Sequence, residues 1–192
     1  AQGIGAPSFP LGCSFVLSYA KHQLGHEFDF QLFKFPKELD EAMRDDIPDM
    51  LCFSNYSWNL QLTYKFASLA KALKPNLITV FGGTNFPTYD KEKIEFLRKK
   101  PYLDFYIELE GELGFVDLTK RIMAYDFDVQ KLKKQKEIIL NTAYLLEDQL
   151  IAGPAERIHD INIIPSPYLT GVLDKFFDVS LIPMLETTRG CP

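Results

Sequence analysis

Cysteine is scarce in this sequence of 192 residues, and long apolar runs are absent. Cys13, Cys52 and Cys191 are too few and too scattered for a disulfide framework, the usual staple of small secreted domains. No apolar run approaches the ~18 residues that a membrane-spanning helix requires, and no secretory signal is visible. The sequence therefore predicts a protein of the reducing cytoplasm without a membrane partner.

Positive charge is also in short supply. The chain has 21 Lys and Arg residues against 26 Asp and Glu residues, a net charge of −5. Its one basic cluster, Lys131-Leu132-Lys133-Lys134-Gln135-Lys136, is expected to be a solvated helix face. Because nucleic-acid binding needs a basic surface, we expect no nucleic-acid binding by this chain.

Familiar catalytic and metal-binding patterns are missing as well. The sequence contains no GxGxxG, phosphate-loop or nucleophile-elbow motif. His22, His26 and His159 lack metal-ligand partners at useful spacing, and Gly25 is expected to end a helix between the first two. We therefore predict no catalytic residue in this chain.

Short apolar runs alternate with amphipathic stretches up to about Tyr125. The alternation predicts strands near 28–34, 50–54, 77–82 and 104–108, and helices near 11–24, 37–47, 62–73, 89–100 and 112–125. Strands separated by helices indicate right-handed crossovers in a parallel sheet. The expected fold class is therefore α/β: a Rossmann-like, doubly wound parallel sheet with helices on both faces, within residues 1–127.

The pattern changes after Asp128. Apolar triplets at 138–140, 144–146 and 149–151 predict a small antiparallel hairpin, and Ile164-Pro165-Ser166-Pro167 predicts an extended, mobile linker within residues 128–179. Residues 180–192 are expected to begin another domain. Residues 1–10 show no strand pattern, so we expect the first central strand upstream, elsewhere in the chain or in a neighbour.

Ligands of doubly wound sheets bind beyond the carboxyl ends of the strands. Three loops expected there carry our candidate site residues: Ser54, Tyr56, Trp58 and Asn59; Gly82, Gly83 and Thr84; and Glu110, Gly111 and Glu112. The glycine pair would let the backbone pass close to a bulky ligand, so a large residue at Gly83 is expected to block binding and leave the fold intact. Ordinary roles stay open: a tight turn at Gly82-Gly83, a helix N-cap at Ser54 or Thr84, packing of Trp58 against the following helix, and acidic residues at a helix start at Glu110 and Glu112.

These loops in this order, followed by Ile164-Pro165-Ser166-Pro167-Tyr168-Leu169 and Glu186-Thr187-Thr188-Arg189-Gly190-Cys191-Pro192, resemble the cobalamin-binding class of radical S-adenosylmethionine enzymes. The resemblance covers nearly the whole chain. It implies that the three loops line a corrinoid and that Cys191 is the first of three ligands of a [4Fe–4S] cluster. The other two ligands and the S-adenosylmethionine site would belong to the chain's own C-terminal radical barrel, cut off here.

Two departures from that family pattern matter. The third loop commonly opens with Gly-Glu-Gly-Glu, whereas this chain has Glu108-Leu109-Glu110-Gly111-Glu112. The DxHxxG sequence that supplies an axial histidine in other cobalamin proteins is absent. Cobalt would therefore receive no histidine from such a motif.

The resemblance implies a domain that presents a corrinoid to the barrel, for methyl transfer or related radical chemistry on a small-molecule or unknown substrate. The fragment alone is expected to be inactive. One alternative is a cofactor-free docking or regulatory module of the same fold. A receiver-like or flavodoxin-like domain is a second alternative, although neither the acidic cluster of receivers nor a phosphate-rich flavin loop is visible.

Overall fold

The computed structural model describes residues 7–177, 180–187 and 189. The chain divides into two compact units. One unit is Glu41–Arg157, and the other combines Ala1–Asp40 with Ile158–Pro192. Each is described by itself below.

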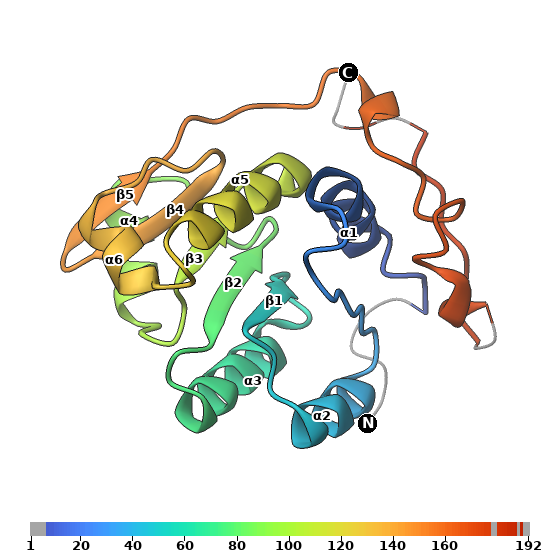
Figure 1. Cartoon of the computed structure of the whole chain (residues 1–192), viewed down its shortest axis with the longest axis horizontal. Coiled ribbons are helices and arrows are strands. Elements are labelled where there is room, and N and C mark those ends of the chain that lie inside the picture. Colours follow the sequence, from blue (N-terminus) through green and yellow to red (C-terminus); the bar gives the residue numbers. More distant parts are fainter. Residues whose placement is uncertain (1–6, 178–179, 188, 190–192) are drawn as a thin grey trace. The chain divides into compact units, whose positions relative to one another are not determined.

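The unit Glu41–Arg157 is built on a five-stranded sheet in the order β1-β2-β3-β4-β5 (Figure 1). Its parallel part comprises β1 (Met50–Ser54), β2 (Ile78–Gly82) and β3 (Phe105–Ile107). The hairpin of β4 (Thr142–Leu146) and β5 (Gln149–Ala152) is antiparallel and joins this sheet beside β3. The predicted strands at these positions are therefore confirmed, and the hairpin extends the main sheet.

Helices cover both faces of this sheet. On one face, α3 (Leu60–Leu73) and α4 (Asp90–Arg98) contribute Ala67 and Leu97 to a cluster with Phe81 and Tyr106. Adjacent strand residues point to opposite faces, so Ile107 lies on the other face, where α5 (Gly111–Ala124) packs closely. A Cβ added at Gly114 of α5 would lie 2.6 Å from Ile107 Cγ2. The expected α/β class, with helices flanking the sheet, is confirmed.

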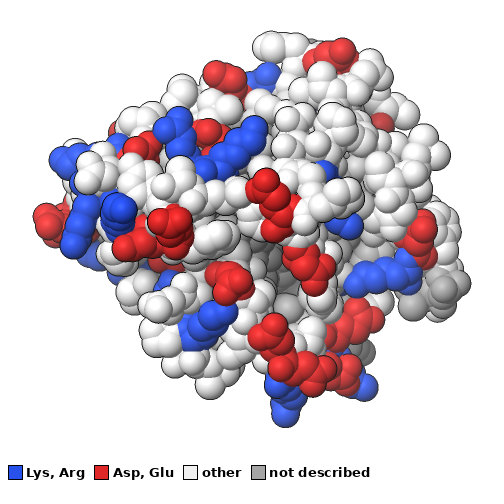
Figure 2. Space-filling model, in the orientation of Figure 1, with Lys and Arg blue, Asp and Glu red and all other residues white. Residues whose placement is uncertain are grey.

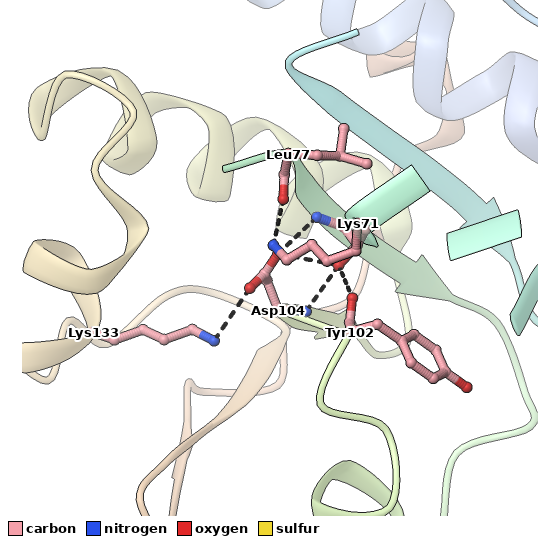
Figure 3. Close-up of polar contacts among 6 residues, drawn as sticks. Lys71, Leu77, Tyr102, Asp104 and Lys133 are labelled. Carbon is pink, nitrogen blue, oxygen red and sulfur yellow. Dashed lines mark hydrogen bonds and ion pairs between the residues drawn. The ribbon is translucent and has the colours of Figure 1, made fainter. Parts of the chain in front are cut away.

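A buried ionic network joins the amino ends of β2 and β3 to two helices (Figure 3). Asp104 Oδ2 accepts hydrogen bonds from Lys71 Nζ at 2.6 Å and from the Thr79 main-chain nitrogen at 2.9 Å. Lys133 of α6 (Val129–Lys134) places Nζ 3.8 Å from Asp104 Oδ1. Burial lowers the pKa of Lys133, an effect that Asp104 opposes. One carboxylate thus forms ion pairs with two lysines from different helices.

The prediction that the basic cluster at 131–136 is a solvated helix face is therefore wrong for part of the cluster. Lys133 is only 8% exposed, and its Nζ lies over the rings of Phe105 and Tyr144. Leu132 and Tyr144 are completely buried. The predicted hairpin is also not a separate element, because β4 pairs with β3 and Tyr144 packs against Phe105.

The second unit packs residues from both ends of the described chain together. It contains α1 (Leu11–Leu24) and two short 3-10 helices, η1 (Ile161–Ile163) and η2 (Asp174–Phe176). Phe9, Leu173 and Phe176 form its buried cluster, and the Ser18 hydroxyl donates to the Pro165 carbonyl at 2.7 Å. The proline-rich segment is therefore bound to α1. Helix α2 (Pro36–Asp45) crosses the boundary between the units.

The strand predicted near 28–34 does not form. No described strand pairs with this segment, and main-chain groups of an isolated strand would lack hydrogen-bond partners. Its period-two pattern instead brings two side chains together, since the rings of Phe28 and Phe30 lie 5.5 Å apart. Alternation describes where side chains point, whereas a strand also requires a neighbour.

The surface carries both signs of charge. On the face drawn in Figure 2, Lys and Arg side chains are interspersed with Asp and Glu side chains. None of the described helices is long and apolar enough to cross a membrane.

Candidate functional site

The three predicted site loops begin at one edge of the sheet. In the parallel register, Ser54 of β1 lies opposite Gly82 of β2, and Gly82 lies opposite Ile107 of β3. Each of these residues ends its strand. The structure therefore brings together the loops that are separate in the sequence, at the carboxyl edge opposite the Asp104 network.

Asn59 closes the first loop. Its Nδ2 donates to the Ser54 carbonyl at 2.9 Å and to the Ser54 hydroxyl at 3.1 Å, and its Oδ1 accepts from the Tyr56 main-chain nitrogen at 2.9 Å. Asn59 is also the residue before α3, but its side chain makes no capping hydrogen bond. The amide of Asn59 therefore shapes the loop, and the Ser54 hydroxyl keeps its own proton to donate.

Tyr56 and Trp58 form a flat aromatic surface on this loop. Their rings are 4.7 Å apart and inclined by only 5°. Trp58 is 58% exposed, so it is not buried against the following helix, which was the alternative role. The stacked pair presents an aromatic face to solvent.

The second loop touches the first through its main chain. Gly83 has a φ of +125°, and a Cβ at this position would lie 2.9 Å from the Asn55 carbonyl oxygen. At Gly82 the nearest atom would be the Ile107 carbonyl oxygen, at an ordinary 3.5 Å. Of these two glycines, only Gly83 is therefore required to be glycine, and its close neighbour in the structure is Asn55.

Two residues that the sequence analysis missed lie beneath these loops. Asn55 and Tyr106 are completely buried. Asn55 Nδ2 donates to the hydroxyls of Tyr64 and Tyr106, each at 3.2 Å, and the Tyr106 hydroxyl donates to the Gly83 carbonyl at 2.9 Å. Burial raises the pKa of Tyr106 well above its usual value, so the hydroxyl keeps its proton. Asn55 lies inside a predicted loop, but its sequence position carries no sign of burial.

Among the described residues, Asn55 Oδ1 is the one buried side-chain nitrogen or oxygen atom without a hydrogen-bond partner. A buried acceptor of this kind costs about 1–3 kcal/mol if nothing donates to it. The second loop also borders a hollow of about 320 Å³, lined by Thr84, Asn85, Phe86, Pro87, Glu92 and Phe96. The exposed hydroxyl of Thr84 is thus available at this hollow.

The third loop turns its acidic residues inward. Glu108 Oε1 and Oε2 accept from Lys93 Nζ at 2.8 and 2.7 Å. Glu110 and Glu112 are 6% and 3% exposed. Gly111 begins α5, so Glu112 lies in its first turn, where a carboxylate favours the helix dipole.

Leu109 is the exposed member of the third loop. It occupies the place of a glycine in the Gly-Glu-Gly-Glu pattern, and it is 53% exposed. Its φ of +52° is a left-handed conformation that glycine adopts most easily. The loop therefore keeps a glycine-like backbone without the glycine.

The predicted metal ligand, Cys191, lies outside the described residues. Within the described ranges, no group of three or more His, Cys, Asp or Glu side chains is placed to hold a metal ion. The cluster-ligand prediction thus stays a prediction.

Comparison with known proteins identifies the family. Residues 3–119 match the family model of the B12 binding domain. The chain is 29% identical to the cobalamin-dependent radical SAM methyltransferase TokK of Streptomyces tokunonensis. It is 28% identical to the 2-(S-pantetheinyl)-carbapenam-3-carboxylate methyltransferase of Streptantibioticus cattleyicolor. Each comparison covers 97% of this chain and 28% of the relative, so the chain spans less than a third of either.

A solved structure shares the fold. The structure of the cobalamin-dependent S-adenosylmethionine radical enzyme OxsB, with aqua-cobalamin and S-adenosylmethionine bound, matches with a TM-score of 0.65 and 22% identity. That match covers 97% of this chain and 25% of OxsB. Since the family model spans more than half of the sequence, the chain belongs to the B12 binding domain family, in the form found in cobalamin-dependent radical SAM enzymes.

Proposed function

We propose that this domain binds cobalamin across the carboxyl edge of β1, β2 and β3. The observation that carries the proposal is the register of Ser54, Gly82 and Ile107, which starts all three loops at one edge. Ligands of open parallel sheets bind beyond this edge. The strand order of the described residues runs from β1 to β5 without reversal, so the proposal rests on the edge rather than on a switch point.

The residues at this edge fit a corrinoid, which combines a flat ring system with many amide side chains. The exposed Trp58–Tyr56 stack offers a flat apolar surface. Ser54 and Thr84 offer hydroxyls, and the buried Asn55 Oδ1 lacks a donor within the described residues. Glu110, Gly111 and Glu112 complete the proposed lining. The side chains of Glu110 and Glu112 are buried within the loop.

Bound cobalamin would supply a cobalt centre able to carry a methyl group. The domain's own residues would bind and orient the corrin, and residues 41–157, which contain the three loops, have no histidine to offer to cobalt. In the parent protein, we propose that the corrinoid faces a C-terminal barrel with a [4Fe–4S] cluster and S-adenosylmethionine. Cys191 would be the first ligand of that cluster. Methyl transfer in the cytoplasm is the corresponding activity, on a substrate bound largely by the barrel.

Titration of the purified chain with hydroxocobalamin tests the proposal. We expect saturable binding by equilibrium dialysis, a changed visible spectrum, and weaker binding after Trp58→Ala. Leu73→Ala is the matched control, because Leu73 is also exposed, at 71%, but lies at the end of α3 that leads to the start of β2, at the opposite edge of the sheet from the loops. Absence of binding would favour the cofactor-free docking module, and equal binding by Trp58→Ala would remove Trp58 from the proposed site.

The cluster needs a separate experiment. This chain, supplied with iron and sulfide, should form no stable cluster and should not cleave S-adenosylmethionine. A protein extended by about 250 residues, roughly one barrel's length, should do both. Cleavage by the 192-residue chain alone would contradict the assignment of Cys191 as one of three ligands.

A further inference from the structure

The glycine loop, residues Gly82–Phe86, is held at both ends by one buried side chain. The Tyr106 hydroxyl donates to the Gly83 carbonyl at 2.9 Å. The ring of Tyr106 also stacks on Phe86, with centroids 4.0 Å apart and an angle of 10°. Tyr106 is in the middle of β3 and has no exposed surface. A rigid strand residue therefore sets where this loop begins and where it ends.

Asn55 holds the same loop from the other side through its main chain. Its nitrogen donates to the Gly82 carbonyl at 2.6 Å, and its carbonyl accepts from the Asn85 nitrogen at 3.3 Å. Between these two bonds, Gly83 approaches so closely that even a Cβ would meet the Asn55 carbonyl oxygen at 2.9 Å. The loop has little freedom to shift while Asn55 stays in place.

Tyr106 and Asn55 also constrain each other. The Tyr106 hydroxyl has one proton, which goes to Gly83, so toward Asn55 Nδ2 it can only accept. The amide of Asn55 must therefore turn its nitrogen toward Tyr106, which turns Oδ1 away. That orientation produces the unpartnered buried acceptor at the proposed corrinoid edge.

We infer that Tyr106 and Asn55 are positioning residues of the corrinoid site: they hold the glycine loop and the Asn55 acceptor in the binding-competent arrangement. This inference rests on the proposed function. The Tyr106 hydroxyl and Asn55 Nδ2 need not contact the ligand. A loop that is already ordered in the free protein does not lose conformational entropy on binding, and the affinity is higher for that reason.

Tyr106→Phe is the direct test, since it keeps the ring on Phe86 and removes only the hydroxyl. Tyr144→Phe is a closely matched control. Tyr144 is equally buried, and its hydroxyl donates to the main-chain carbonyl of Glu137 at 3.0 Å, outside the three loops. Both variants should lose thermal stability. Only Tyr106→Phe should raise the Kd of hydroxocobalamin, by about tenfold, the factor expected for one unsatisfied buried polar group.

Asn55→Ala adds a test of the coupling. It removes Nδ2 and Oδ1 and retains the main-chain contacts. We expect weaker corrinoid binding, and we expect the double variant with Tyr106→Phe to lose less affinity than the two single losses combined, because residues of one network are not additive. Independent, additive losses would overturn the mutual constraint, and wild-type affinity in Tyr106→Phe would overturn the positioning role.

Amide hydrogen exchange in the unliganded chain separates this inference from the proposed function. Exchange of the Asn85 amide should accelerate in Tyr106→Phe and stay unchanged in Tyr144→Phe. If the wild-type chain binds no corrinoid, the proposed function is wrong, while the exchange result still decides whether Tyr106 holds the loop. Equal protection of Asn85 in both variants would refute the loop's dependence on Tyr106, even if Tyr106→Phe proves too unstable for binding measurements.

Discussion

Gly83 and Asn55 are in main-chain contact: a Cβ on Gly83 would lie 2.9 Å from the Asn55 carbonyl oxygen and 3.3 Å from the Asn55 nitrogen. Two loops that follow different strands therefore meet without a side chain between them. The contact also changes what a substitution at Gly83 should do. The sequence-based expectation that a large residue would leave the fold intact is wrong, because the residue would displace Asn55 before it reached any ligand.

Gly83→Ala should therefore lower both stability and corrinoid affinity. The strained φ of +125° and the clash with Asn55 should cost about 1–3 kcal/mol of unfolding free energy. Gly82→Ala is the control, because its Cβ would meet the Ile107 carbonyl oxygen at an acceptable 3.5 Å. Urea denaturation of both variants measures the difference, and equal stability of the two would contradict the contact.

Leu109→Gly should cost no stability, although glycine usually weakens a folded chain. Leu109 has a φ of +52°, and relief of that conformation is worth roughly 1 kcal/mol, which offsets the extra freedom of glycine in the unfolded chain. Leu69→Gly is the comparison, since Leu69 is similarly exposed, at 50% against 53%, but lies within α3. There we expect a loss of about 1 kcal/mol. Thermal unfolding of the pair is the measurement, and a similar loss in both would show that the left-handed backbone is not at issue.

Asp104→Asn should be strongly destabilising, because Lys71 and Lys133 would lose the carboxylate between them. Removing one partner of a buried ion pair typically costs about 3–5 kcal/mol. Asp49→Asn provides the exposed counterpart: Asp49 pairs with Lys74 at 2.7 Å, but its side chain is 80% exposed. Exposed pairs contribute little, so only the Asp104 variant should shift the urea midpoint clearly. Comparable midpoints would mean that the network in Figure 3 does not stabilise the fold.

Alkaline pH should destabilise the fold through its buried tyrosines. Burial raises the pKa of Tyr144 to about 12, from a usual value of 10.0, and raises that of Tyr106 as well. Between about pH 10 and about pH 12, a tyrosine in the unfolded chain has released its proton, whereas Tyr144 in the folded protein has not. The unfolded state therefore binds fewer protons, and stability falls as pH rises. The lowered pKa of Lys133 acts in the opposite sense and below its usual value of 10.5.

Urea midpoints measured from about pH 9 to about pH 12 check this slope. Above about pH 10.5, where the opposing effect of Lys133 has ended, stability should decline as pH rises. Tyr144→Phe should decline less steeply than the wild-type chain, because one of the titrating groups is gone. A wild-type curve that rises above about pH 10.5, or a variant curve of the same steepness, would contradict the assignment.

Local pattern was sufficient for most of the secondary structure. Pro10 and Gly25 bound the apolar run that forms α1 at Leu11–Leu24, and the continuous apolar runs at 50–54 and 77–82 form β1 and β2. These elements depend on hydrophobic periodicity and on residues that begin or end a helix, both of which are properties of neighbouring residues. The segment near 28–34 has a strand-like pattern and forms no strand, because pairing requires a second strand that local pattern does not supply.

The sequence by itself determined the order of the three loops, and with it the family, because motif residues such as Gly82 and Gly83 lie close together along the chain. Only the tertiary structure decided which buried polar groups hold those loops. Asn55 and Tyr106 are 51 residues apart, and Lys133 reaches Asp104 from a helix beyond the sheet's parallel part. Such contacts depend on strand register and on which face of the sheet a helix covers. Burial then makes each hydrogen bond between them matter, since water cannot replace it.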